Sequence, residues 1–335
     1  MEQNLLEMLL SEMSVSGEEF ALQDKLAAHM ESVSDSMDKD SIGNGVYFVK
    51  GMGRKRILLA AHIDEIGLMI TGVTAQGYLR VINVGGIHAR TYPGHGVRIQ
   101  TEQGIIYGSV ILEAKALKQE EFTAKNLLID IGADSKEEAL KLIRIGDTAV
   151  PDAGLRKLAG GRLMARGLDD KSGVYVIMEA LKRLKRQETP NTVLAAATVG
   201  EEIGQHGASW TAARTCPDEA IIVDVTYTSD YPGVEHAEWG EIELGKGPAI
   251  GVNPICDKQI TRALMEIAEK EGIPYQTEVN GGRSCTDADE IHISGTGIPV
   301  ALVSVPLRYM HSPAEVADEK DLENAVRLLA AYLSR

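Results

Sequence analysis

The apolar run Ile57-Leu58-Leu59-Ala60-Ala61, which leads directly into His62-Ile63-Asp64, decides the fold class. A membrane helix needs about 20 apolar residues, so this run is too short to span a membrane. A short apolar run bounded by polar residues is typical of a strand that is covered on both faces of a parallel sheet. In such sheets ligands bind at the carboxyl ends of the strands, which is where His62 and Asp64 lie.

Similar apolar runs follow along the chain and alternate with helical patterns, which is the signature of βαβ units. We therefore expect an α/β fold with a mostly parallel central sheet flanked by helices. A capping box formed by Ser16 and Glu19 is expected to open an amino-terminal helix. The other expected strands lie at 45–50, 193–199, 220–225, 275–279 and 300–305, and the other expected helices at 174–184, 208–213, 258–271 and 319–333.

Residues 71–161 have a different sequence pattern, in which short β-prone runs are separated by glycine-containing turns. We expect a small β-rich domain here, with one helix that starts near Ser135. It would be inserted into a catalytic domain formed by residues 1–70 and 162–335.

Composition narrows the class of protein. The 335 residues include 49 acidic and 34 basic side chains, a net charge of −15 that disfavours nucleic acids and anionic membranes as partners. The chain has only three cysteines, Cys216, Cys256 and Cys285, which is an odd number, and they are far apart in sequence. A disulfide framework is therefore not expected. The amino terminus lacks a basic leader. These features favour a cytoplasmic protein.

Polar residues that bind metals follow the expected strands. Carboxylates gathered at one sheet edge would repel one another unless cations neutralised them, and imidazoles among carboxylates suit Zn, Co or Mn. Two ions need one bridging carboxylate and at least two further ligands each, which two histidines and three acids can supply. The candidates are His62, Asp169, Glu201 or Glu202, Asp224 and His311, with Asp64 placed to orient the ring of His62.

The adjacent acids Glu201 and Glu202 point in different directions, so one can ligate a metal while the other acts as general base. Each motif also has a structural explanation. His62 could be a core histidine, Asp169-Asp170 could cap a helix, and the glutamates could be a charged strand end. Asp224 is harder to explain in that way, because an acid inside an apolar strand is costly without a partner. All five motifs together favour the metal site.

Five motifs resemble, in order, those of the tetrahedral or glutamyl aminopeptidase family of dinuclear metallo-aminopeptidases. That family also includes proteins labelled deblocking aminopeptidase or cellulase M. The resemblance implies a zinc-aminopeptidase-like fold with a PDZ-like inserted domain used in assembly, and a homo-oligomer that is often a dodecamer. The motifs are His62–Gly67, Leu168–Gly173, Gly200–Gly204, Val223–Thr226 and Tyr309–Pro313.

The resemblance also implies roles for single residues. Asp169 would bridge the two ions, with His62 and Asp224 at one of them and Glu202 and His311 at the other. Glu201 would be the proton acceptor, and Asp64 would support His62.

By similarity, the loop 281–287 borders the substrate pocket, which makes Arg283, Thr286 and Asp287 candidates for substrate binding. The family more often has a plain Gly-Gly-Thr-Asp run there, so Arg283 is a departure. Arg283 could favour an acidic substrate side chain or be a solvated loop residue. Gln205-His206 replaces a more usual apolar-basic pair.

The function expected from these features is removal of N-terminal residues from peptides with a free N-terminus. One alternative is metal-dependent hydrolysis of another bond, by a deacylase of N-acyl amino acids, an amidase or a glycosidase. Glycosidases usually need two metal-free carboxylates, which disfavours that option. A catalytically silent metal-binding scaffold is the other alternative, although no ligand is missing.

Overall fold

The computed structural model describes residues 3–113, 116, 121–185, 189–234 and 240–335. Its centre is an eight-stranded sheet with the strand order β1-β2-β12-β3-β13-β16-β14-β15. The strands are β1 Ser36–Lys39, β2 Gly45–Val49, β3 Arg56–His62, β12 Thr192–Thr198, β13 Glu219–Tyr227, β14 Ala249–Val252, β15 Gln276–Val279 and β16 Val300–Leu307.

This sheet is mixed, which corrects the expectation of a mostly parallel sheet. The four central strands β12, β3, β13 and β16 run parallel. The outer strands β1, β2 and β14 pair antiparallel with their inner neighbours, while β15 runs parallel to β14. The parallel core places the carboxyl ends of its four strands at one edge, as the site requires.

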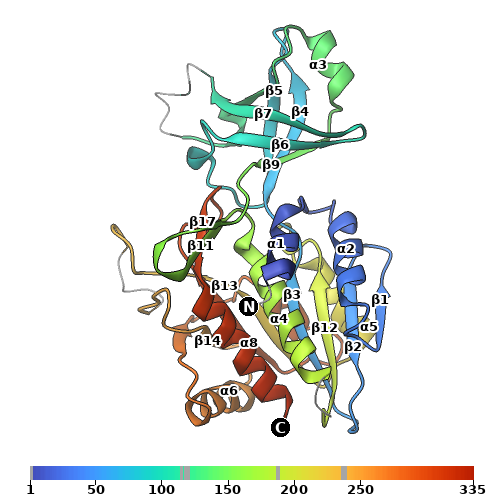
Figure 1. The fold of residues 1–335 in the computed structure, drawn as a ribbon, viewed down its shortest axis with the longest axis vertical. Coiled ribbons are helices and arrows are strands. Elements are labelled where there is room, and N and C mark those ends of the chain that lie inside the picture. The colour runs from blue at the N-terminus through green and yellow to red at the C-terminus, as the bar shows by residue number, and fades with distance from the viewer. Residues whose placement is uncertain (1–2, 114–115, 117–120, 186–188, 235–239) are drawn as a thin grey trace.

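Helices cover both faces of the sheet (Figure 1). On one face Leu59 and Ala61 of β3 pack in the larger core cluster, and on the other face Leu58 and Ala60 pack in a second cluster. This alternation follows from the two-residue period of a strand and explains the continuous apolar run. The first face is covered by α1 Gln3–Ser11, α2 Phe20–Met30, α4 Leu168–Lys185, α6 Lys258–Lys270 and α8 Glu319–Leu333, and the second by α5 His206–Thr215 and α7 Ala288–His292.

The expected capping box before α2 is wrong. Glu19 is the residue before the helix, and it has helical φ and ψ angles and makes no side-chain cap. The Ser16 hydroxyl instead donates a hydrogen bond to Asp64, 2.7 Å away. Tertiary contact with the strand end has replaced the local cap that the spacing suggested.

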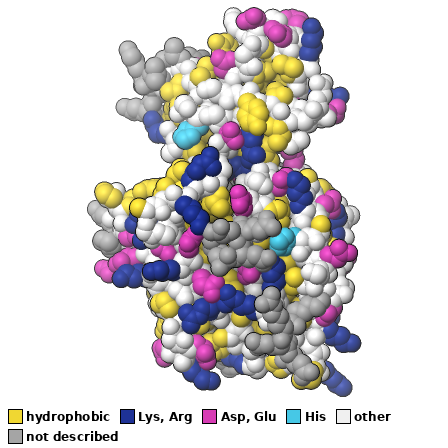
Figure 2. All heavy atoms as spheres, in the orientation of Figure 1, with side chains coloured by type: hydrophobic (Ala, Val, Ile, Leu, Met, Phe, Trp, Pro, Cys, Tyr) yellow, Lys and Arg dark blue, Asp and Glu magenta, His cyan; other side chains and the backbone are white. Residues whose placement is uncertain are grey.

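Within residues 67–151, six strands form a closed barrel in the order β4-β5-β8-β7-β6-β9. The barrel stands at one end of the molecule, and Figure 2 shows a narrower waist beneath it. The expected helix at Ser135 is present, because Ser135 caps α3 by accepting the N–H of Glu138. The elements are β4 Gly67–Val73, β5 Leu79–Val84, β6 Gly96–Thr101, β7 Gly104–Leu112, β8 Leu127–Asp130, α3 Lys136–Leu142 and β9 Thr148–Pro151.

After the barrel, β10 Arg156–Lys157 and β11 Arg162–Ala165 form a three-stranded antiparallel sheet with β17 Glu315–Asp318, which comes from near the end of the chain. Short 3₁₀ helices occupy Ala89–Thr91, Ala124–Asn126 and Ala159–Gly161. Among the described residues, no helix is both long and apolar enough to cross a membrane. On the face in Figure 2, acidic and basic side chains are interspersed, so the negative charge is not gathered there.

Candidate active site at the carboxyl ends of the parallel strands

The structure brings the predicted site residues together at the carboxyl edge of the parallel strands. His62 ends β3, and Asp224 lies in β13. Asp169 stands at the start of α4, where it and Asp170 have non-helical φ and ψ angles and share a cis peptide bond. Glu201 and Glu202 lie in the turn after β12, and His311 lies in the turn between β16 and β17.

Asp169 lies between the two imidazoles. Its Oδ1 is 3.1 Å from His62 Nε2, and its Oδ2 is 3.1 Å from His311 Nε2. Burial would raise the pKa of the Asp169 carboxyl, but its bonds with His311 and His62 hold that pKa well below its usual value. One carboxylate that presents separate oxygens to two histidines has the arrangement expected of a bridging ligand.

Asp64 is buried and holds the turn that carries the glutamates. Its carboxylate accepts the N–H of Glu201 at 3.1 Å and the N–H of Glu202 at 3.2 Å, in addition to the Ser16 hydroxyl. His62 Nδ1 lies 3.1 Å from the backbone oxygen of Asp64 and 3.5 Å from its carboxylate. The backbone and the side chain of Asp64 thus both contact the ring of His62, and the side chain also positions the turn.

Glu201 and Glu202 point to different partners. Glu201 Oε2 lies 4.0 Å from His62 Nε2, and Glu202 Oε1 lies 3.5 Å from His311 Nε2. Burial raises the pKa of both carboxyls, and the neighbouring charge of Asp169 adds to this rise. These groups hold their protons more tightly than free glutamates unless a positive charge is supplied.

Asp170 joins the site, although sequence reasoning gave it no role beyond helix capping. It is fully buried, and its Oδ2 accepts the N–H of His62 while its Oδ1 accepts the N–H of Gly173. Ligand atoms of Asp170, His62 and Asp224 all lie within 4.8 Å of one another. The doubled aspartate before a helix was the available signal, and the bond from Gly173 to Asp170 agrees with the capping interpretation.

Glu315 was missed by the sequence reasoning. Its carboxylate accepts the N–H groups of His311, at 2.9 Å, and of Asp169, at 3.2 Å, and so connects two candidate ligands. Burial raises the pKa of Glu315 to about 8, and the Asp169 charge contributes. An acid followed by apolar residues in a short strand was the only sequence signal.

The residues present fit divalent cations. Glu202 Oε1 is buried and accepts no hydrogen bond, although carboxylate oxygens in protein interiors are normally paired. Burial raises the pKa of Asp224 well above its usual value, and the Asp170 charge adds to this. Cations would neutralise both groups. His62, Asp169 and Glu202 form a second set of ligand atoms within 4.8 Å of one another.

The three residues predicted to bind substrate lie in the loop before α7. Thr286 and Asp287 are buried, and Asp287 accepts the hydroxyl hydrogen of Thr198. Burial raises the pKa of Asp287 to about 8, and the charge of Glu201 adds to the effect. Arg283 is exposed and donates to Asp289 and Gln205. Substrate binding by these residues stays a prediction.

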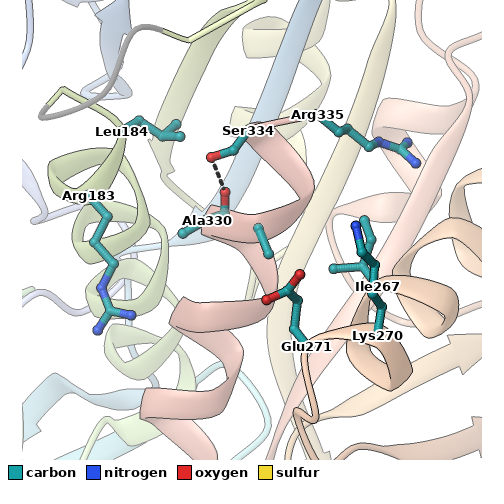
Figure 3. A pocket seen from close by; sticks show the side chains of 9 residues that line it. Arg183, Leu184, Ile267, Lys270, Glu271, Ala330, Ser334 and Arg335 are labelled. Carbon is teal, nitrogen blue, oxygen red and sulfur yellow. Dashed lines mark hydrogen bonds between the residues drawn. The ribbon is translucent and has the colours of Figure 1, made fainter.

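A hollow of about 600 Å³ lies elsewhere, between the carboxyl-terminal ends of α4, α6 and α8, and Arg183, Lys270, Glu271 and Arg335 line it (Figure 3). Arg183 lies near the end of α4, whereas Asp169 lies at its start, about 20 Å away at 1.5 Å per residue. The hollow is therefore separate from the histidine and carboxylate cluster.

Solved structures with this fold include aminopeptidases. One from the archaeon Desulfurococcus kamchatkensis is 39% identical with a TM-score of 0.93, and the match covers 99% of this chain and 94% of that one. The TET1 peptidase of Pyrococcus horikoshii, which can assemble into a tetrahedron or a large octahedral shell, is 35% identical with a TM-score of 0.86, over 99% and 98% of the two chains. The fold and the site thus define a peptidase of the aminopeptidase class.

The family follows from the sequence match. Residues 43–328 match the M42 glutamyl aminopeptidase family. The lysyl aminopeptidase of Pyrococcus furiosus is 32% identical over 98% of this chain and 96% of its own length. This chain belongs to the M42 glutamyl aminopeptidase family.

Proposed function

We propose that this aminopeptidase removes N-terminal residues from peptides with the help of two divalent ions, and that Glu201 is its general base. The observation that carries the proposal is the position of Asp169, whose two oxygens each lie 3.1 Å from a different imidazole. Asp169 would bridge the ions, with His62 and Asp224 as further ligands of one and Glu202 and His311 as further ligands of the other. The donor set suits Zn, Co or Mn.

The ions, when bound, supply Lewis acidity that polarises the scissile carbonyl and makes water a better nucleophile. The protein supplies the proton transfer. Glu201 Oε2 is on the side of the cluster and can take a proton from the attacking water and return it to the leaving amine. Asp64 holds the backbone of Glu201 in place through the N–H bond, which supports this role.

Replacing the base tests this mechanism. Glu201→Gln should retain two metal ions per chain, measured by elemental analysis, and lose about 10²- to 10⁴-fold in kcat. Glu266→Gln, at an exposed position on α6, is the matched control and should keep full activity. A Glu201→Gln variant with its metals and with normal turnover would contradict the assigned base.

The substrate class is tested separately with aminoacyl anilides and the same compounds acetylated at nitrogen. We expect cleavage only of the compounds with a free amine, loss of activity with a chelator, and recovery with Zn²⁺, Co²⁺ or Mn²⁺. Equal cleavage of the acetylated compounds would instead indicate a deacylase or amidase.

We also propose that the chain forms a homo-oligomer, a dodecamer, through the barrel. The support is its similarity to TET peptidases, one of them solved as a dodecamer at 35% identity. Light scattering would give the mass of twelve chains, and a monomer mass would refute the assembly.

A further inference from the structure

Gln205 contacts the side chain of the proposed base. Its side-chain nitrogen Nε2 donates a hydrogen bond to Glu201 Oε1 at 3.0 Å. Gln205 is buried and has a left-handed backbone, with φ of 60°. Its own N–H donates to the carbonyl oxygens of Gly200 and Glu201. The turn thus holds the amide of Gln205 beside the glutamate.

The other end of the same amide is held by Arg283. The guanidinium Nη2 donates to Gln205 Oε1 at 3.3 Å, and Arg283 Nε donates to Asp289 Oδ2 at 3.1 Å. A guanidinium can only donate and an ionised carboxylate can only accept. An amide between Arg283 and Glu201 therefore has one favourable orientation, with its oxygen toward the arginine and its nitrogen toward the glutamate.

Asp289 anchors the loop that carries Arg283. Its carboxylate accepts the N–H groups of Ser284 and Cys285 and the Ser284 hydroxyl. Because 69% of the Arg283 side chain is exposed, its ion pair with Asp289 contributes little to stability. The effect of the pair is to aim the guanidinium at Gln205.

The two oxygens of Glu201 have different surroundings as a result. Oε1 accepts the bond from Gln205, and Oε2 is the oxygen that lies 4.0 Å from His62 Nε2, on the side of the cluster. Without the bond to Oε1, the carboxylate could rotate about its terminal torsion, which has a broad, shallow energy profile. Proton transfer is efficient only when the base stays within hydrogen-bond reach of the water.

From these contacts we propose that Gln205 is a positioning residue for Glu201 and that Arg283 acts through Gln205 rather than on the substrate side chain. The inference rests on the proposed role of Glu201 as general base. The proposed interaction connects two segments, 205–206 and 281–287, in which this sequence departs from the pattern of its family. Those segments are 78 positions apart and meet only in the folded chain.

A double-mutant cycle tests the inference. Gln205→Met, Arg283→Met and the double variant are assayed as Co²⁺-loaded protein with an aminoacyl anilide, with metal content measured for each. We expect Gln205→Met to lower kcat about 10-fold, with KM changed less than twofold, and Arg283→Met to lower kcat about 3-fold. The kcat of the double variant should be no lower than that of Gln205→Met, because Arg283 is proposed to act on Glu201 only through the Gln205 amide. Arg262→Met, at an exposed position on α6, is the control.

An additive loss in the double variant, or an Arg283→Met effect confined to KM for one class of substrate, would overturn the proposal and indicate direct substrate contact. Crystal structures of the metal-free parent and Gln205→Met give a readout independent of activity. The Glu201 carboxylate should be rotated or disordered only in the variant, and an unchanged carboxylate would contradict the proposal. The Glu201→Gln variant distinguishes this proposal from the proposed function. Full activity of Glu201→Gln would refute the role of Glu201 as general base. An inactive Glu201→Gln together with a fully active Gln205→Met would refute only the positioning role of Gln205.

Discussion

His311 Nδ1 lies 2.7 Å from the carbonyl oxygen of Gly86, a residue 225 positions earlier in the chain. Gly86 belongs to the loop that follows β5 of the barrel. A carbonyl oxygen only accepts, so Nδ1 carries a hydrogen and Nε2 faces Asp169. The barrel thus completes the site by orienting one of its histidines.

Gly86→Ala tests this contact. An added Cβ would lie 3.1 Å from His311 Nδ1, closer than ordinary contacts, so the ring should shift. We expect a 10- to 100-fold loss of affinity for one of two ions, in the range found when residues that orient metal ligands are changed. Calorimetric titration of the metal-free protein measures it. The control is Gly96→Ala, whose added Cβ meets nothing closer than 3.9 Å, and it should bind both ions normally. Unchanged metal affinity of the Gly86→Ala variant would refute the role of the loop.

Ser16→Ala tests the amino-terminal contact with Asp64. The hydroxyl of Ser16 is one of three donors to that buried carboxylate. Losing a hydrogen bond to a charged group should lower the free energy of unfolding by about 1.5 to 3 kcal/mol. Urea denaturation at pH 7 measures the change, with Ser11→Ala on the exposed end of α1 as control. Equal stability of the two variants would show that the contact contributes nothing.

Glu65→Gln tests a buried charge cluster beside the site. Glu65 pairs with Arg166 and with Lys171, at 2.8 Å for the lysine, and all three are buried. Burial would raise the pKa of Glu65, but Arg166 and Lys171 lower it to about 2. Removing the carboxylate leaves two buried cations unpaired, so we expect a loss of about 3 to 5 kcal/mol of stability.

The control for that variant is Glu102→Gln, which breaks an exposed pair with Arg144. It should change stability by less than about 0.5 kcal/mol. Denaturant melts of the metal-free proteins compare the two. Similar losses of unfolding free energy in the two variants would show that the buried cluster contributes no more to stability than an exposed ion pair.

The Glu19→Gln variant tests whether ionisation of Glu19 makes the stability of the folded chain depend on pH. Burial raises the pKa of Glu19 from 4.5 to about 7 in the folded chain, although the N–H of Gly17 opposes this. A carboxyl with a raised folded pKa contributes stability that is present below about pH 4.5 and is lost as the pH rises through about 7. Glutamine cannot ionise and keeps an acceptor for Gly17.

At pH 8 the Glu19→Gln variant should therefore exceed the parent in stability, by no more than about 3 kcal/mol, and the difference should shrink as the pH falls and vanish below about pH 4.5. Unfolding free energies measured from about pH 4 to 8 give the two curves. Glu31→Gln, at an exposed position, should run parallel to the parent. A Glu19→Gln curve parallel to the parent's would contradict the prediction.

Much of the fold could be predicted from sequence because its signals are local. The run ending in His62, the strands 193–199 and 300–305 and the final helix all appear near the expected positions. The antiparallel strand β14 was not expected, since its four residues Ala249–Val252 carry no distinctive period. Strand direction depends on the partner strand and on the connection, and neither is visible in a short run.

By itself, the sequence determined which residue types follow each parallel strand, and hence that histidines and carboxylates gather at one edge. Only the tertiary structure decided how they are held. The bonds of Ser16 to Asp64, Gly86 to His311 and Arg283 to Gln205 join residues 48 or more positions apart. Local patterns report the period of burial along one element, whereas such contacts depend on the packing of several elements around a site. That packing also directs an oxygen of Glu201 toward the cluster.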